Sequence, residues 1–264
     1  MNILLIFALY ALNGSTVTIS KIMLLYASPM MIIGIRMVIA GVLLFAYYRF
    51  IIGKKIKISK KLYPLLIQSA LCNILIPYTL RYWSMQYLTA TKTAFFYNLI
   101  PFITYALAIA LGMDKVSWKK SLGLGIGFIG ILPILISGSP IEELIGGISF
   151  ISLPEAAMIL SVISISYSWI VIQKIVRRYH ISTFLVNGVN MLLSGLIALP
   201  ISFLIESNHT ITSPGAFTGW LFLNILITNF ICYNMYAALL RHFSSTLIAF
   251  ASLVMPFFAA LTGY

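Results

Sequence analysis

Long apolar runs, separated by short polar connections, dominate the sequence. Nine runs carry few or no charges, and each approaches or exceeds the roughly 20 residues that a helix needs to cross a hydrocarbon core of about 30 Å. The pattern therefore predicts an all-α polytopic membrane protein with nine transmembrane helices. They are expected at residues 3–20, 28–50, 63–83, 90–112, 119–137, 155–173, 182–205, 216–240 and 244–264.

Composition supports the same class. Of the 264 residues 61% are hydrophobic and 8% are charged, and the mean hydropathy is +1.03, which is too apolar for one soluble core. The first run lacks a basic segment before it and a clear cleavage site after it, so we interpret it as the first helix. Cys72 and Cys232 fall inside predicted helices and are interpreted as packing residues, with no disulfide, metal or cofactor expected.

The net charge of +12 is concentrated in alternate loops. Thirteen basic residues follow the second, fourth, sixth and eighth predicted helices, and by the positive-inside rule these loops and the N-terminus face the cytoplasm. They are Arg49, Lys54, Lys55, Lys57, Lys60, Lys61, Lys115, Lys119, Lys120, Lys174, Arg177, Arg178 and Arg241. The charge thus indicates a lipid bilayer rather than a nucleic acid as the partner, and we expect a multi-pass protein of a bacterial inner (cell) membrane.

The two halves of the chain resemble each other. A shift of 153 to 155 residues aligns several landmarks, which include Gly41 with Gly195, Tyr78 with Tyr233, and Pro101 with Pro256. We predict two repeats, residues 1–137 and 155–264. Because a unit of five helices has an odd number of crossings, the second unit is expected to be inverted (5+5), an arrangement typical of transporters with a site at the repeat interface.

The second copy of the fifth helix would fall near residues 274–292, beyond Tyr264. We therefore expect the tenth helix to be missing through truncation, with a natural nine-helix variant as the alternative.

Several motifs resemble the drug/metabolite transporter superfamily, and its EamA-type branch most closely. They are the segments 88–102 (LTATKTAFFYNLIPF), 111–120 (LGMDKVSWKK) and 244–246 (SST), with Pro256-Phe257 near the end. The resemblance implies ten helices, cytoplasmic termini and transport of small organic solutes. Where that branch often has Gly-Glu, this chain has Gly112-Met113-Asp114, so the role of that acid does not carry over directly.

Five residues are candidates for substrate binding. Arg36 is the only formal charge well inside a predicted helix, and such charges are costly and mark functional sites; it is expected to bind a carboxylate or phosphate, unless it bonds neighbouring carbonyls or extends to the interface. Tyr78 and Tyr233 occupy matching places and are expected to face each other across a central cavity. Asn98 and Asn190 are the candidate amides, with bonds between helices as the alternative.

Pro101 and Pro256 are candidate gating residues, because a proline inside a helix frees a carbonyl and kinks the chain. Kinks that serve only packing are the alternative. The GxGxxG pattern at residues 125–130 lies inside an apolar run and follows no strand, so it is interpreted as a helix-packing face and not as a nucleotide site.

No Asp, Glu or His occupies the middle of a predicted helix, so facilitated diffusion or exchange is expected rather than proton-driven transport. The leading hypothesis is a secondary transporter, not an enzyme, that moves a small metabolite by alternating access. Amino acids, or amino-acid-bearing compounds such as S-adenosylmethionine, suit one cation, amides and aromatic faces. A membrane-embedded enzyme and a non-transporting scaffold remain alternatives, and the oligomeric state stays open.

Overall fold

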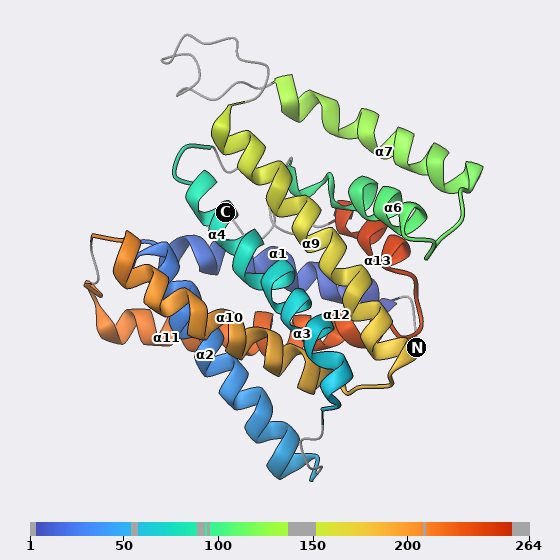
Figure 1. The fold of residues 1–264 in the computed structure, drawn as a ribbon. Coiled ribbons are helices and arrows are strands. Elements are labelled where there is room, and N and C mark those ends of the chain that lie inside the picture. Colours follow the sequence, from blue (N-terminus) through green and yellow to red (C-terminus); the bar gives the residue numbers. More distant parts are fainter. Residues whose placement is uncertain are drawn as a thin grey trace.

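The protein is all-helical in the parts that the structure describes. The computed structural model describes residues 4–53, 58–88, 93, 96–136, 152–207 and 210–254, and helices and their connections account for all of these residues (Figure 1). The prediction of an all-α fold is confirmed to this extent.

The helices of each half follow the predicted order. The first half contains α1 (Leu4–Met23), α2 (Pro29–Ala46), the π-helical segment η1 (Tyr47–Ile51), the 3₁₀ turn η2 (Lys60–Leu62), α3 (Tyr63–Ala70), the π-helical segment η3 (Leu71–Leu75), α4 (Ile76–Ser84), α6 (Ile100–Ala110) and α7 (Trp118–Ile136). The second half contains α9 (Leu153–Arg178), α10 (Thr183–Ile205), α11 (Pro214–Asn224), the π-helical segment η4 (Ile225–Cys232), α12 (Tyr233–Leu239), α13 (Ser245–Ala251) and the 3₁₀ turn η5 (Ser252–Val254).

Five of the described helical segments are long and apolar enough to cross a membrane. They are Pro29–Ile51, Lys60–Ser84, Leu153–Arg178, Thr183–Ile205 and Pro214–Leu239. Leu4–Gly14, the first part of α1, and Ile100–Ala110, which is α6, are shorter apolar stretches of helix. Every predicted run overlaps a helix, but the count of nine crossings stays a prediction.

The predicted continuous helix 90–112 is the clearest difference between the sequence analysis and the structure. Asn98 and Leu99 form a turn, and α6 begins only at Ile100. Pro101 therefore lies in the first helical turn, where its missing N–H would have no helical partner in any case. The proline starts a helix here and does not kink the interior of one.

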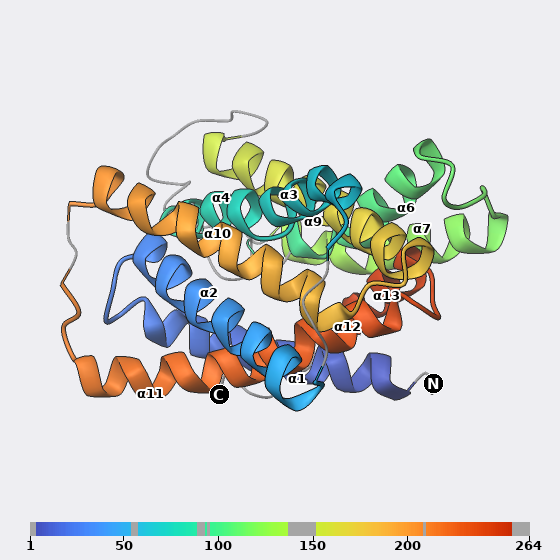
Figure 2. The ribbon, with the colours of Figure 1, turned by 60° about the horizontal axis from the view of Figure 1, so that its bottom comes forward.

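The contact between α2 and α10 is the most extensive one between helices, and Figure 2 shows the two helices running close together. Glycines allow this approach. A Cβ atom added to Gly41 would lie 2.7 Å from the backbone nitrogen of Leu192, and one added to Gly195 would lie 2.6 Å from that of Val38. Small residues that let two backbones approach are the usual basis of helix packing in a bilayer.

A carboxylate joins the same two helices at one end. Glu206, directly after α10, accepts hydrogen bonds from the Ser28 hydroxyl at 2.6 Å and from the backbone N–H of Met30 at 2.7 Å. The first N–H groups of a helix lack partners within it, and a negative charge there is favourable. Glu206 therefore caps α2.

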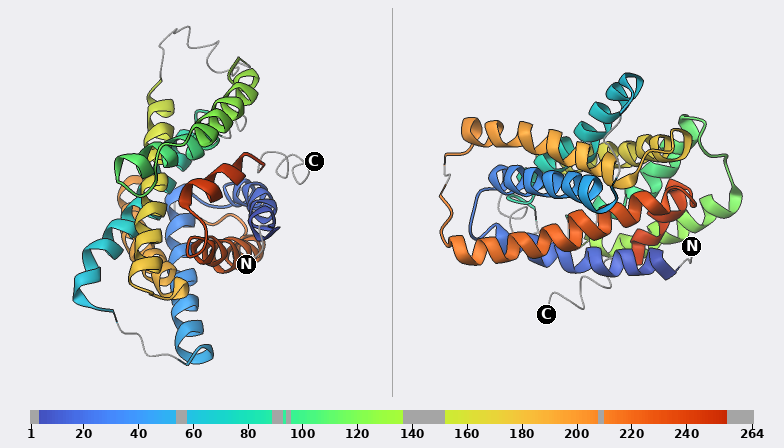
Figure 3. Two further views of the ribbon diagram at one scale, coloured as in Figure 1. Left: turned by 90° about the vertical axis from the view of Figure 1, so that its right-hand side faces the viewer. Right: turned by 90° about the horizontal axis from the view of Figure 1, so that it is seen from below.

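The remaining helices enclose the centre of the molecule. α9 packs along α4 and η3, where Ser161 donates to the carbonyl of Pro77 at 2.9 Å and Ser164 to that of Cys72 at 3.0 Å. α1 lies beside α11, η4 and α12 (Figure 3). α7 lies at the edge of the bundle, with Trp118 and Ile129 largely exposed (Figure 1).

Candidate functional site

A cavity of about 130 Å³ lies in the interior, between helices of both halves. Residues of α1, α2, α4, α6, α9, η4 and α12 line it, together with the turn before α6 and η5. No Asp, Glu or His is among its described lining residues. Six of the lining side chains are aromatic: Tyr10, Tyr78, Tyr97, Trp169, Tyr233 and Tyr236.

Arg36 lies on the cavity wall with only part of its hydrogen-bonding capacity used. Its side chain is 1% exposed, and Nη1 donates to Oδ1 of Asn224 at 3.2 Å. Nε and Nη2 have no partner, and Cζ lies 5.1 Å from the centroid of the Tyr78 ring. A buried cation is costly unless it is paired, so this guanidinium is suited to an anionic group of a ligand.

The structure brings Tyr78 and Tyr233 together. The hydroxyl of Tyr233 donates to that of Tyr78 at 3.0 Å, and both side chains line the cavity. Each tyrosine follows a π-helical segment, η3 before Tyr78 and η4 before Tyr233. A π-helical turn changes the direction in which the following side chains point, and such turns are frequent at functional sites.

Aromatic rings from the second half form another wall. The rings of Trp169 and Tyr236 stack with centroids 3.7 Å apart and planes inclined by 28°, and the Tyr233 ring lies 5.8 Å from that of Trp169. Tyr10 meets this wall from α1 in the first half, and its hydroxyl donates to the carbonyl of Ile248 at 2.8 Å. Flat apolar faces of this kind suit a planar ring or a cation.

Arg81 also lines the cavity, and the sequence analysis missed it because it lies near the end of its predicted helix. It follows Tyr78 by three residues, a spacing that places both on one face of a helix and is the signal that identifies it. Its Cζ lies 4.8 Å from the ring centroid of Tyr97 and 5.9 Å from that of Tyr82. Its Nε is buried without a partner.

Asn98 and Asn190, the two candidate amides, are placed differently. Asn98 is buried and lines the cavity from the turn before α6. Asn190 is fully buried but is not on the cavity wall, and its Oδ1 accepts a hydrogen bond from Ser69 at 2.7 Å. That bond ties α10 to α3, which is the packing alternative for such an amide.

The two candidate gating prolines remain untested as a pair. Pro101 is buried in the first turn of α6, next to the cavity-lining Ile100. Pro256 lies outside the described residues.

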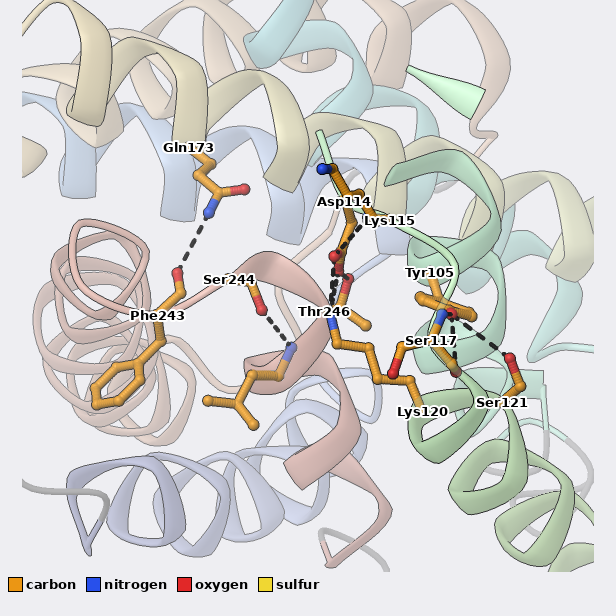
Figure 4. Close-up of polar contacts among 11 residues, drawn as sticks. Tyr105, Asp114, Lys115, Ser117, Lys120, Ser121, Gln173, Phe243, Ser244 and Thr246 are labelled. Atoms are coloured by element: carbon orange, nitrogen blue, oxygen red, sulfur yellow. Dashed lines mark hydrogen bonds and ion pairs between the residues drawn. The ribbon is translucent and has the colours of Figure 1, made fainter. Parts of the chain in front are cut away.

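Asp114 links the two halves away from the cavity, in the loop between α6 and α7 (Figure 4). Lys120 Nζ lies 2.6 Å from its Oδ2, and the hydroxyl of Thr246 on α13 donates to the same oxygen at 3.1 Å. Burial acts to raise the pKa of Asp114, but hydrogen bonds from Lys120, from the backbone N–H of Lys115 and from Thr246 outweigh it and hold the pKa below its usual value. The displaced acid of this chain therefore contacts the second half.

Comparison with known proteins identifies relatives of this chain. The sequence profile described as "EamA-like transporter family" matches residues 1–136 and 153–264. A protein of Chlamydia muridarum (strain MoPn / Nigg), named "S-adenosylmethionine/S-adenosylhomocysteine transporter", is 29% identical over 267 residues, which cover 100% of this chain and 83% of that protein. Its namesake from Chlamydia trachomatis serovar L2 is also 29% identical, over 269 residues that cover 100% of this chain and 81% of the relative.

A solved structure shares the fold. It is described as "Crystal structure of protein" and superposes with a TM-score of 0.73 at 14% identity, covering 98% of this chain and 86% of that one. The family profile matches nearly the whole sequence, and the apolar helices agree with a multi-pass membrane protein. The chain is therefore a membrane transporter that belongs to the EamA-like transporter family.

Proposed function

We propose that this protein carries amino-acid-bearing compounds across a bacterial inner membrane by alternating access, with S-adenosylmethionine and S-adenosylhomocysteine as the favoured substrates. Both compounds combine a carboxylate with an adenine ring. The observation that carries the proposal is Arg36, a buried guanidinium with two unpartnered nitrogens on the wall of a cavity lined by aromatic rings. The names of the chlamydial relatives agree with this substrate class.

Arg36, Tyr78, Tyr233 and Asn98 are the proposed binding residues, since all four line the same cavity. Asn190 is proposed to act indirectly, through α10, because it lies off the cavity wall. We also propose the repeat boundaries 1–137 and 155–264, nine crossings in this chain, and an N-terminus in the cytoplasm; the basic loops support this orientation.

Reciprocal glycine contacts support the inverted repeat. A shift of 154 residues aligns Gly41 with Gly195 and Val38 with Leu192. The close approach of Gly41 to Leu192 therefore has a counterpart in the close approach of Gly195 to Val38. Two helices that exchange equivalent contacts in this way are related by a local twofold axis.

Shifts of 154 or 155 residues relate two further pairs of contacts. Gly34 approaches Leu199, and its counterpart Gly188 approaches Phe45, the residue equivalent to Leu199. Arg36 donates to Asn224, while Ser69 donates to Asn190. A shift of 154 residues relates Arg36 to Asn190, and one of 155 relates Ser69 to Asn224. Hydrogen bonds between equivalent positions, with donor and acceptor exchanged, thus connect α2 with the second half and α10 with the first.

Exchange of substrates is the proposed mode of transport. Proton-coupled carriers use buried acids or histidines as proton carriers, and the described lining of the cavity contains none. An empty cavity would leave the charge of Arg36 uncompensated inside the membrane. This cost disfavours the step in which the carrier reorients without a bound ligand. A carrier with this property moves one substrate outward as it moves another inward.

Ligand-induced stabilisation of the purified full-length protein tests this function. S-adenosylhomocysteine or S-adenosylmethionine at about 100 times its Kd is expected to raise the free energy of unfolding by roughly 2.7 kcal/mol, seen as a higher melting temperature. Arg36→Gln, which keeps a donor for Asn224, is expected to abolish the shift. Arg49→Gln removes an exposed arginine on η1 and serves as the matched control. A wild-type protein that neither compound stabilises, or an undiminished shift in Arg36→Gln, would contradict the proposal.

A further inference from the structure

The cavity holds a second cation that the proposed function does not use. Arg81 reaches the wall from α4, with Cζ 4.8 Å from the Tyr97 ring centroid. Within the described part of the chain, neither Arg81 nor Arg36 forms an ion pair with a carboxylate. Two guanidinium groups that have no carboxylate partner among the described residues therefore line one small cavity.

Arg81 also forms a side-chain hydrogen bond with Tyr97, and it keeps further capacity to bind an anion. An aromatic ring covers a face of a guanidinium group and leaves the N–H groups at its edge available. The Nε of Arg81 is one such group, because it is buried and has no hydrogen-bond partner. Its planar fork matches the two oxygens of a carboxylate.

The two cations break the symmetry of the repeats. The counterpart of Arg36 is Asn190 and that of Arg81 is Tyr236, so both charges come from the first half. Tyr236 instead stacks on Trp169, with ring centroids 3.7 Å apart. The cavity thus has one wall from the first half that carries both cations together with Tyr10, Tyr78 and Tyr97, and one wall from the second half whose described residues include Trp169, Tyr233 and Tyr236 but no cation.

We propose that Arg81 is a second anion-binding residue and that, with Arg36, it orients the ligand by binding its carboxylate end. The adenine ring then lies toward Trp169 and Tyr236. This inference rests on the proposed function, because it assigns the two ends of the proposed substrate to the two walls. A cavity with symmetric walls would not distinguish the ends of the ligand, whereas this one favours a single orientation.

Two probes separate the amino-acid end from the rest of the ligand. S-adenosylhomocysteine carries an amino-acid group with its carboxylate, while 5′-methylthioadenosine keeps the adenosine and the thioether but lacks the whole amino-acid group. Titration of the detergent-purified full-length protein with each probe gives two dissociation constants. Arg81→Gln is expected to raise the dissociation constant of S-adenosylhomocysteine at least tenfold and that of 5′-methylthioadenosine less than twofold. Trp169→Ala is expected to weaken both by similar factors.

Arg81→Lys keeps the positive charge without the fork and is used if Arg81→Gln does not fold; it is expected to show the same selectivity with a smaller loss. Unchanged S-adenosylhomocysteine affinity in these variants, or equal losses for both probes, would overturn the role of Arg81 and leave the proposed function intact. If neither the wild-type protein nor the control variant Arg49→Gln binds either probe, the result would instead contradict the proposed function itself.

Discussion

Among single residues, the two tyrosines between the halves make a contact whose energy can be measured. The hydroxyl groups of Tyr78 and Tyr233 bond each other at 3.0 Å, and both side chains are less than 10% exposed. The net contribution of such a bond is about 1 kcal/mol, but a buried hydroxyl that loses its partner costs about 1–3 kcal/mol. Removing one partner should therefore cost more than half of what removing both costs.

Tyr78→Phe and Tyr233→Phe are each expected to destabilise the protein by about 1–2 kcal/mol, and the double variant by clearly less than the sum. Melting temperatures of the four proteins in one detergent, without ligand, measure this coupling. Additive effects would show that the two hydroxyls do not depend on each other. Tyr63→Phe, which alters a half-exposed tyrosine at the start of α3, is the control.

At the scale of helices, the crossing of α2 and α10 holds the two halves together. Backbone atoms of one helix occupy the space that a side chain on Gly41 or Gly195 of the other would need. The carboxylate of Glu206 adds a polar connection at one end of the same pair. We expect the pair to act as one rigid unit, because any added atom at the crossing separates two backbones and not only two flexible side chains.

Gly41→Ala and Gly195→Ala are each expected to destabilise the protein by about 1–3 kcal/mol through overpacking. Gly125→Ala in α7 and Gly219→Ala in α11 are matched controls, since an added Cβ meets nothing within 4 Å at either position. Alanine has the higher helix propensity, so the controls should be neutral or more stable by up to about 1 kcal/mol. Similar melting temperatures for all four variants would contradict the close crossing.

For the molecule as a whole, every predicted apolar run overlaps a described helix, and the family motifs indicate the transporter class, whereas the nine crossings and the inverted repeat stay predictions. Details that depend on tertiary contacts were not accessible. The sequence does not show whether Pro101 kinks a helix or begins one, because both fit a proline in an apolar run. Arg81 lies near the end of the predicted helix 63–83, where charged residues usually meet the interface, but the packing of α4 directs it to the cavity. Asn98 and Asn190 are both amides within predicted apolar helices, so the sequence does not distinguish them. In the structure Asn98 lines the cavity, whereas Asn190 bonds to Ser69.

Exchange across a sealed membrane tests the central claim most directly. Proteoliposomes loaded with unlabelled S-adenosylhomocysteine are placed in labelled S-adenosylmethionine, and the initial rate of uptake is compared with that of empty ones, with and without a pH gradient. We expect internal S-adenosylhomocysteine to accelerate uptake several-fold and the pH gradient to have no effect. Arg36→Gln should reduce uptake to the level of protein-free liposomes, while Arg49→Gln should keep the wild-type rate. Uptake that follows the pH gradient and ignores the internal substrate, or that persists in Arg36→Gln, would contradict the account.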